Sequence, residues 1–143
     1  MEGPSNIANF IRRHHVLTLA TCGENVPWCA NIFYAWMPAE KLFVFTSETA
    51  TRHGEQMEHN AQVAASIVLE TKVVGLVRGL QIRGVAARPE GAELEKVRRA
   101  YLRRFPFAAL ATLELWTLRP TYMKMTDNRI AFGKKTEWHN DEQ

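Results

Sequence analysis

The segment from Lys41 to Leu69 constrains the fold most, because it predicts a strand, a helix and a second strand in close succession. Its first strand is the apolar run 41–46, and its second covers residues 62–69. A hydroxyl-rich turn and a short helix over residues 51–60 lie between them. Three residues that favour helix N-caps mark the start of this helix: Ser47, Thr49 and Thr51.

The charge at the start of this helix is unusual. Arg52 and His53 fall in the first turn, where free backbone N–H groups and the helix dipole already supply positive potential. Hydroxyls, an arginine and a histidine together suit a bound anion, most simply a phosphate. The other interpretation is a surface helix on which Arg52 pairs with Glu48 or Glu55, and the residues alone leave both open.

Length and composition indicate a single domain. A chain of 143 residues is long enough for one core, so residues 1–143 are taken as one unit. No apolar run approaches the ~18 residues of a membrane span, and the N-terminus lacks the pattern of a signal peptide. We therefore expect a cytoplasmic protein without membrane contact. The net charge of +3 is modest and permits an anionic ligand.

Motifs for autonomous catalysis are absent from the sequence. It contains no G-x-S-x-G, P-loop, Rossmann or H-E-x-x-H pattern, and no catalytic side chain can be assigned. Cys22 and Cys29 have neither metal-site spacing nor partners for a disulfide framework, so we expect buried thiols and no metal site. An enzyme of this composition must take its chemistry from a cofactor.

The remaining pattern predicts mostly strands. We expect helices over residues 5–14 and 92–105, and strands over 16–22, 26–36, 80–86, 113–118, 121–126 and 129–132. Short strands with a few helices between them favour a small antiparallel barrel with peripheral helices. The arginines of the 92–105 helix are typical of a solvated face. No strand interleaves aromatic and basic residues, so nucleic-acid binding is not expected.

Three local features have two interpretations each. Asn31 is the single polar side chain in the centre of its strand, and either satisfies a backbone group or contacts a ligand. Gly79 and Gly84 either mark bulges, which we favour, or leave space for a flat ligand. The tail from Gly133 through Trp138 is either a frayed end or a functional segment with an exposed tryptophan.

These residues resemble a known family. Thr46, the turn, Thr51-Arg52-His53 and Asn60 are similar to the strand–turn–helix segment of the pyridoxamine 5′-phosphate oxidase-like flavoproteins. The segment from Arg78 to Gly84 resembles their later strand, in which a glutamine contacts the flavin. Nearly all 143 residues resemble the bacterial YhbP subgroup of this family.

The resemblance implies an antiparallel split β-barrel that binds FMN and forms a homodimer with two flavins at the interface. Thr51 and Arg52 would hold the phosphate, and His53 replaces the family's lysine, so a fixed charge becomes titratable. The main chain around Asn31 would line the ring edge, and Gln81 would reach it from the neighbouring strand. The predicted cofactor-binding residues are Asn31, Ile32, Phe33, Thr46, Ser47, Thr51, Arg52, His53, Gln81, Lys134, Lys135 and Trp138.

The function that follows is a flavin-dependent oxidoreductase of unknown substrate. The alternative is a non-enzymatic barrel that stores or senses a flavin or haem. Pyridoxamine phosphate oxidation is not supported, because Trp138 is the only counterpart of the family's Trp- and Arg-containing C-terminal segment. Lys134, Lys135 and Trp138 would instead reach across a two-fold interface towards the flavin of the partner chain.

Overall fold

The computed structural model describes residues 5–129, 131 and 133–140. Its helices are α1 (Ser5–Arg13), α2 (Arg52–His59) and α3 (Gly91–Arg104), with short 3₁₀ turns η1 (Val74–Leu76) and η2 (Pro106–Leu110). Its strands are β1 (Val16–Gly23), β2 (Val26–Met37), β3 (Leu42–Thr46), β4 (Gln62–Leu69), β5 (Arg78–Ala87), β6 (Leu115–Asp127) and β7 (Lys134–His139).

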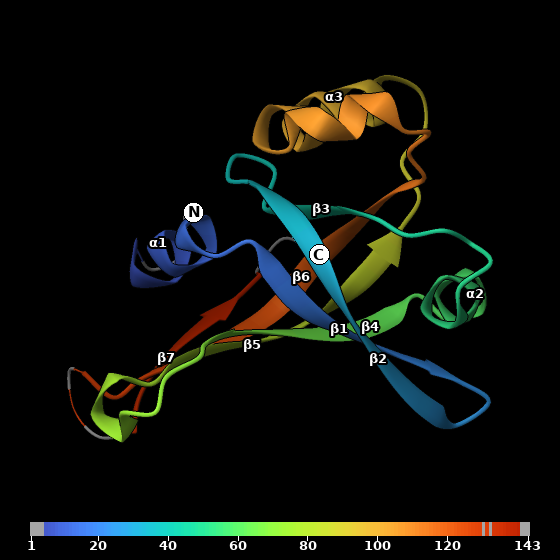
Figure 1. Cartoon of the computed structure of the whole chain (residues 1–143). Coiled ribbons are helices and arrows are strands. Elements are labelled where there is room, and N and C mark those ends of the chain that lie inside the picture. The colour runs from blue at the N-terminus through green and yellow to red at the C-terminus, as the bar shows by residue number, and fades with distance from the viewer. Residues whose placement is uncertain (1–4, 130, 132, 141–143) are drawn as a thin grey trace.

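All seven strands belong to one antiparallel sheet with the order β3-β2-β1-β4-β5-β6-β7 (Figure 1). The sheet joins back on itself, because β3 also pairs with β6 from Phe43↔Leu118 to Thr46↔Leu115. The second half of β6 uses the same edge to pair with β7, from Tyr122↔His139 to Asp127↔Lys134. The ring therefore closes over only part of its height, which confirms the predicted split barrel.

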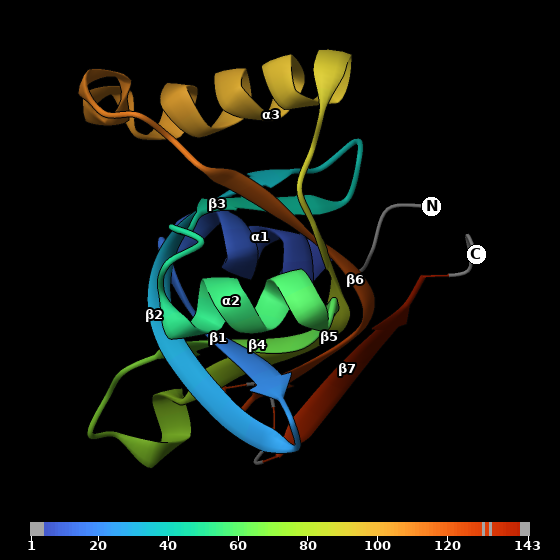
Figure 2. The same cartoon turned by 90° about the vertical axis from the view of Figure 1, so that its right-hand side faces the viewer.

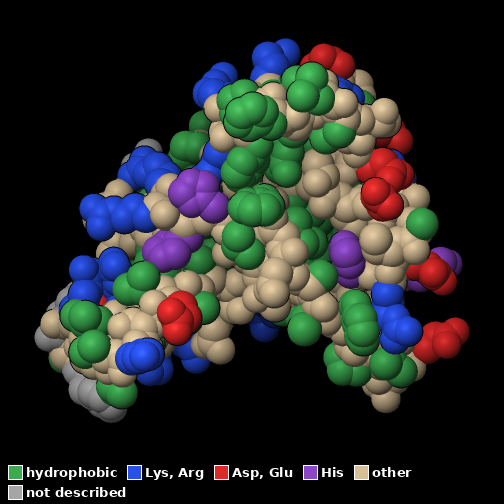
Figure 3. All heavy atoms as spheres, in the orientation of Figure 1, with side chains coloured by type: hydrophobic (Ala, Val, Ile, Leu, Met, Phe, Trp, Pro, Cys, Tyr) green, Lys and Arg blue, Asp and Glu red, His purple; other side chains and the backbone are tan. Residues whose placement is uncertain are grey.

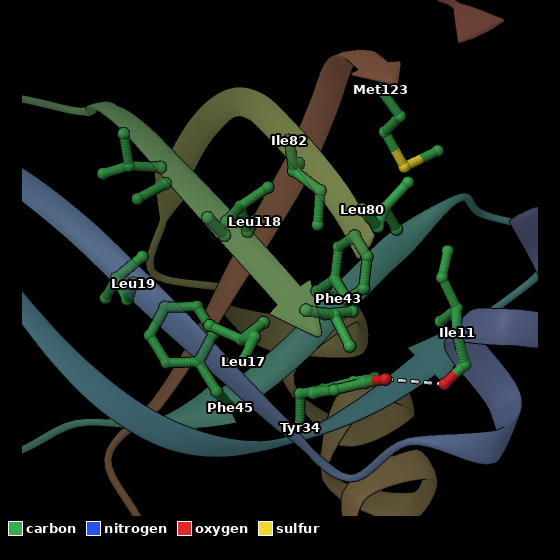
Figure 4. Packing of buried hydrophobic residues seen from close by; sticks show 14 of the residues in the cluster. Ile11, Leu17, Leu19, Tyr34, Phe43, Phe45, Leu80, Ile82, Leu118 and Met123 are labelled. Atoms are coloured by element: carbon green, nitrogen blue, oxygen red, sulfur yellow. Dashed lines mark hydrogen bonds between the residues drawn. The ribbon is translucent and has the colours of Figure 1, made fainter. Parts of the chain in front are cut away.

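The core fills the inside of this barrel. Leu17 and Leu19 of β1 meet Phe43 and Phe45 of β3 there, all fully buried. Figure 4 shows how Tyr34 of β2 points through this cluster towards α1, where its hydroxyl donates to the carbonyl of Ile11 at 2.6 Å. This bond satisfies a buried phenol and attaches α1 to the barrel.

α3 forms a second layer outside β2 and β3 (Figure 2). Val97 and Tyr101 of the helix pack on Ala35, Met37 and Val44 of the two strands. Phe105 follows directly after α3, and its ring meets Phe33 of β2 edge-on with the ring centroids 5.6 Å apart. The outer face of the first half of β2 therefore stays open beside the end of the helix.

The C-terminal third differs from the prediction. β6 runs without interruption through Arg119 and Pro120, because a register shift opposite Arg83/Gly84 accommodates Thr121 as an extra residue. The Thr121 hydroxyl donates to the Arg83 carbonyl at 3.1 Å. The favoured bulge is thus confirmed at Gly84 but not at Gly79, which pairs regularly with Thr126 and Val68.

Two further predictions were wrong. Arg129 lies in a turn and Ala131 in a bend rather than in a strand, while residues 130 and 132 lie outside the described residues. The thiols are not both buried: Cys29 is exposed on the outer face of β2, and Cys22 is half-buried. Cys29 is exposed because half of β2 has no helix covering its outer side.

Candidate functional site

The start of α2 is organised around the side chain of Thr51. Its hydroxyl accepts a hydrogen bond from the Gly54 N–H at 3.1 Å and donates to the Glu48 carbonyl at 2.7 Å. A Cβ at Gly54 would come within 2.3 Å of the Glu48 carbonyl oxygen, so only glycine allows this tight cap. In the described part of the chain, the N–H groups of Arg52 and His53 have no acceptor. They remain free to bind a ligand.

Arg52 is held by an aromatic ring and not by a carboxylate. Its guanidinium carbon lies 4.4 Å from the ring centroid of Trp28, an indole that is 45% exposed. No ion pair to Arg52 occurs among the described residues, so the expected alternative of a pair with Glu48 or Glu55 is not formed. Stacking fixes the guanidinium plane while its N–H groups remain available.

His53 lies beside this arginine and is half-buried. Burial lowers the pKa of its imidazole from the ordinary value, because a charged ring would lose hydration there. Its Nε2 is 3.4 Å from the Thr51 hydroxyl. At neutral pH the ring is therefore an uncharged hydrogen-bonding group, and the only permanent cation in the turn is Arg52.

Thr46 and Ser47 lie at the end of β3, just before the cap. Ser47 is buried: its N–H donates to the Glu114 carbonyl at 3.0 Å, and its carbonyl accepts from the Trp116 indole at 3.2 Å. These bonds fix the point where the chain leaves the barrel for α2. Ser47 thus positions the site, whereas the half-buried Thr46 lies nearer its surface.

The outer face of the sheet holds a second group of predicted residues. Asn31 accepts a hydrogen bond from the Thr18 hydroxyl at 2.7 Å, and the register continues this row through Ser66 to Gln81. The prediction that Gln81 lies on the strand next to Asn31 was wrong, since β1 and β4 separate β5 from β2. Three strand spacings of ~4.8 Å place these two side chains about 14 Å apart.

Ile32 and Phe33 point to opposite sides of β2. Phe33 is 57% exposed on the outer face, whereas Ile32 packs against the core. Ile32 therefore shares the side of the strand that carries Trp28, near the start of α2. The predicted ring-edge residues of β2 divide between two surfaces.

The third group lies on β7, at the far end of the sheet from α2. Lys134 and Lys135 are exposed, and the Lys135 ammonium donates to the Gly133 carbonyl at 3.1 Å. The prediction that Trp138 is exposed was wrong. Its side chain is only 4% exposed and joins the barrel core opposite Met123. Its strand belongs to the sheet, so the tail is not a free arm.

Trp28 and Thr18 were not predicted to belong to the site. Trp28 carried a signal, because a large aromatic close to a hairpin turn, at the end of a strand, has little to pack against except a ligand or a neighbouring cation. The position of Thr18 opposite Asn31 depends on hairpin register. The hairpin turn 23–25 gives this register directly.

Within residues 5–129, 131 and 133–140, no cluster of three or more His, Cys, Asp or Glu side chains could hold a metal ion. Over the same residues, no helix is long and apolar enough to span a membrane.

Comparison with known proteins shows which family this chain is similar to. The family model described as pyridoxamine 5′-phosphate oxidase matches residues 4–127. The chain belongs to the pyridoxamine 5′-phosphate oxidase family. Within it, the chain is 37% identical over 141 residues to a UPF0306 protein of Klebsiella pneumoniae, covering 99% of this chain and 96% of the relative. It is 38% identical over 138 residues to the UPF0306 protein YhbP of Escherichia coli O157:H7, covering 96% and 94%.

Solved structures share the fold of this pyridoxamine 5′-phosphate oxidase family member. A haem-binding protein from Mycobacterium smegmatis superposes with a TM-score of 0.77 at 23% identity, covering 91% of this chain and 55% of that one. HutZ, a haem storage protein from Vibrio cholerae, gives 0.69 at 20% identity, covering 84% and 91%. A FAD-binding protein from Mesorhizobium loti gives 0.68 at 13% identity, covering 85% and 90%.

Proposed function

We propose that this protein binds FMN, with the phosphate held at the start of α2 by Thr51, Arg52 and His53, and acts as a flavin-dependent oxidoreductase. The observation that carries the proposal is the guanidinium of Arg52, which is stacked on Trp28 and free of any carboxylate among the described residues. The guanidinium lies beside the backbone N–H groups of Arg52 and His53, which have no acceptor among the residues that the structure describes. Such an arrangement fits a phosphate dianion.

The surrounding residues also fit the rest of the cofactor. Trp28 and Ile32 give apolar surface on the side of β2 that faces α2, against which a flat ring can pack. The redox chemistry comes from the isoalloxazine ring when FMN is bound. The residues of the chain bind the phosphate, orient the ring and exclude water from one of its faces.

We further propose that each site is completed by a second copy of the chain. Asn31 lies on the outer face of β2, whereas Trp28 lies on the side that faces α2. Gln81 and the lysines of β7 lie on strands that are not neighbours of β2 in the sheet. The outer face of the sheet offers an apolar row for association, in which Phe33 lies opposite Val16 and the β1–β4 register places Val68 next. This face borders a hollow between the β1–β2 hairpin and η1 (Figure 3). A two-fold dimer packed here would bring residues of both chains to each ligand.

A titration of the purified protein with FMN and riboflavin tests the phosphate site. Each charge-assisted hydrogen bond to the phosphate contributes about 1.5–3 kcal/mol, so FMN should bind at least about tenfold more tightly than riboflavin. Quenching of flavin fluorescence gives both dissociation constants. Equal affinities, or no binding of either flavin, would contradict the proposal. Bleaching of the bound flavin by a nicotinamide donor without oxygen then tests the oxidoreductase assignment.

Haem binding without catalysis is the second candidate. It is favoured by the shared fold with proteins described as haem-binding and haem storage proteins. Titration with haemin separates the candidates, because a Soret band that saturates at one haem per chain, together with no affinity for FMN, supports the storage function. Saturation by FMN with no specific haem spectrum supports the flavoprotein.

A further inference from the structure

The split of the barrel contains a cavity on the side of α1. α1 covers the gap that the partial closure of the barrel leaves between β2 and β7. It does not fill this gap completely, and a cavity of about 140 Å³ remains. Most of its wall is apolar: Ile7 and Ile11 come from the helix, Met123 from β6 and Trp138 from β7. Trp36 of β2 forms the remaining side and is half-buried.

The size of the cavity restricts what it can hold. An apolar cavity of roughly 150 Å³ accommodates one benzene molecule. The cavity beside α1 therefore fits a single six-membered ring or a branched alkyl group of similar volume. It is too small for a flavin or a porphyrin, which distinguishes it from the site at α2.

Two cations line the cavity. Arg12 Nη2 donates to the Asn9 side-chain oxygen at 2.6 Å, and the Lys41 ammonium has no partner among the described residues. Among the residues that the structure describes, no carboxylate lines the cavity. Lys41 also adopts φ 55°, the left-handed conformation that glycine or asparagine occupies with less strain. Two unneutralised cations beside an apolar cavity favour a ligand with one apolar end and one anionic end.

We propose that this cavity binds a small aromatic carboxylate. The ring would enter between Trp36 and Trp138, and the carboxylate would remain at the surface between Arg12 and Lys41. Aromatic walls suit a flat ring, and a guanidinium suits a carboxylate because it can donate two parallel hydrogen bonds. The site is independent of the proposed flavin site, since no lining residue belongs to the start of α2.

The surroundings of the cavity add to its attraction for anions. On the other side of Trp36 and Pro38, a hollow of about 430 Å³ is lined by Lys96, Arg99 and Arg103 of α3. Glu40 is the only acidic residue in the described part of its lining, and it is neutralised by an ion pair with Lys96. Figure 3 shows Lys and Arg side chains gathered on this side of the molecule. Such a field raises the local concentration of an anion.

The test uses indole N–H signals in a ¹⁵N-labelled full-length protein titrated with benzoate. Trp36 and Trp138 line the cavity, whereas Trp28 lies beside Arg52 and Trp116 beside Ser47, so the four indoles report separately. Saturable shifts of Trp36 and Trp138, with Trp28 and Trp116 unchanged, support the proposal. Benzyl alcohol has the same ring without the charge, and its affinity should be at least about tenfold weaker.

Variants then assign the binding to this cavity. Arg12→Gln and Lys41→Asn should each weaken benzoate binding about tenfold, because each removes a charge-assisted hydrogen bond. Arg13→Gln is the matched control, since Arg13 lies on the same helix but does not line the cavity. Ala8→Leu should block binding by filling the space. Thermal melting verifies that each variant is folded. If Ala8→Leu does not fold, the charge variants alone test the proposal.

Three outcomes would overturn the proposal. These are no saturable shift of Trp36 or Trp138 at millimolar benzoate, equal affinity for benzyl alcohol, or unchanged affinity in the Arg12→Gln, Lys41→Asn double variant. FMN affinity measured on the same samples remains an independent test of the site at α2.

Discussion

His53 determines how much positive charge the start of α2 carries. Its pKa is lowered by burial, so the free protein presents an uncharged imidazole at neutral pH. A phosphate dianion beside the ring would raise that pKa again, because an opposite charge favours the protonated form. Binding would then take up a proton.

This linkage gives the first prediction. FMN affinity should rise as the pH falls from about 8 to about 6.5, since the pKa of His53 is higher in the complex than in the free protein. His53→Gln should remove this dependence, and His53→Lys should bind FMN about tenfold more tightly than the wild type at about pH 8. Flavin quenching over this pH range provides the measurement. If FMN affinity depends on pH in the same way in the wild type and in His53→Gln, His53 does not contact the phosphate.

Arg52 allows a function to be separated from stability. Arg52→Ala should weaken FMN binding at least about tenfold, because a charge-assisted contact to the phosphate is lost. The melting temperature of the ligand-free protein should change little, since an exposed cation stacked on Trp28 contributes only about 0.5–1 kcal/mol. Arg99→Ala on α3 is the control that should alter neither quantity. A strongly destabilised variant with normal FMN affinity would make Arg52 a structural residue.

β7 shows how a short polar element can be essential to the fold. Its residues alternate between solvent and barrel, and Trp138 is its one buried side chain. Trp138→Ala should lower the free energy of unfolding by about 3–5 kcal/mol, because a large core side chain is replaced by a cavity. Lys134→Ala, on the exposed face of the same strand, should change it by less than about 0.5 kcal/mol. Urea unfolding compares the two, and similar losses would show that Trp138 is not part of the core.

Because the tail forms β7 of the sheet, its function cannot be tested by truncation. Truncation after residue 132 would remove β7 together with its core tryptophan, so lost ligand binding could reflect lost folding. Single variants of Lys134 and Lys135 avoid this problem, because both side chains are exposed.

Elements with clear local signals could be predicted from the sequence. Periodicity gave α1, α3 and the first five strands to within about two residues. Three candidate N-caps, Ser47, Thr49 and Thr51, placed the start of α2 within a few residues, and the structure uses Thr51. β6 could not be predicted as one strand, because Pro120 normally interrupts a ladder and the bulge at Thr121 depends on its partner β5. The burial of Trp138 likewise depends on a neighbour, and not on the sequence of the tail.

At the scale of the whole molecule, strand order limited the prediction of the site. The residues around Thr51 are consecutive and were predicted together. Asn31 and Gln81 come from strands that are not neighbours, and adjacency in a barrel depends on how distant segments pair. For the same reason, the local sequence pattern could not predict that β3 and β7 pair with different halves of the same edge of β6.

Association of two chains gives the final prediction. Phe33→Glu and Val68→Glu together should convert a dimer into monomers, because both side chains are more than half exposed on the outer face and would bring like charges into an apolar contact. The affinity for FMN should fall together with the loss of the dimer. Ala92→Glu, which adds a carboxylate to exposed α3, should change neither. Sedimentation at several concentrations is the measurement, and a wild-type protein that stays monomeric would contradict the two-chain site.

The closure of the barrel has a consequence during synthesis on the ribosome. β3 pairs on one side with β2, which is made just before it, but its other edge must wait for β6. Until then the nascent chain presents an apolar strand with unpaired backbone groups, the kind of edge that recruits other unfolded chains. Late, long-range pairing of this kind also slows folding. We therefore expect the yield of soluble protein to depend on translation rate and on chaperones that shield the nascent β3 edge.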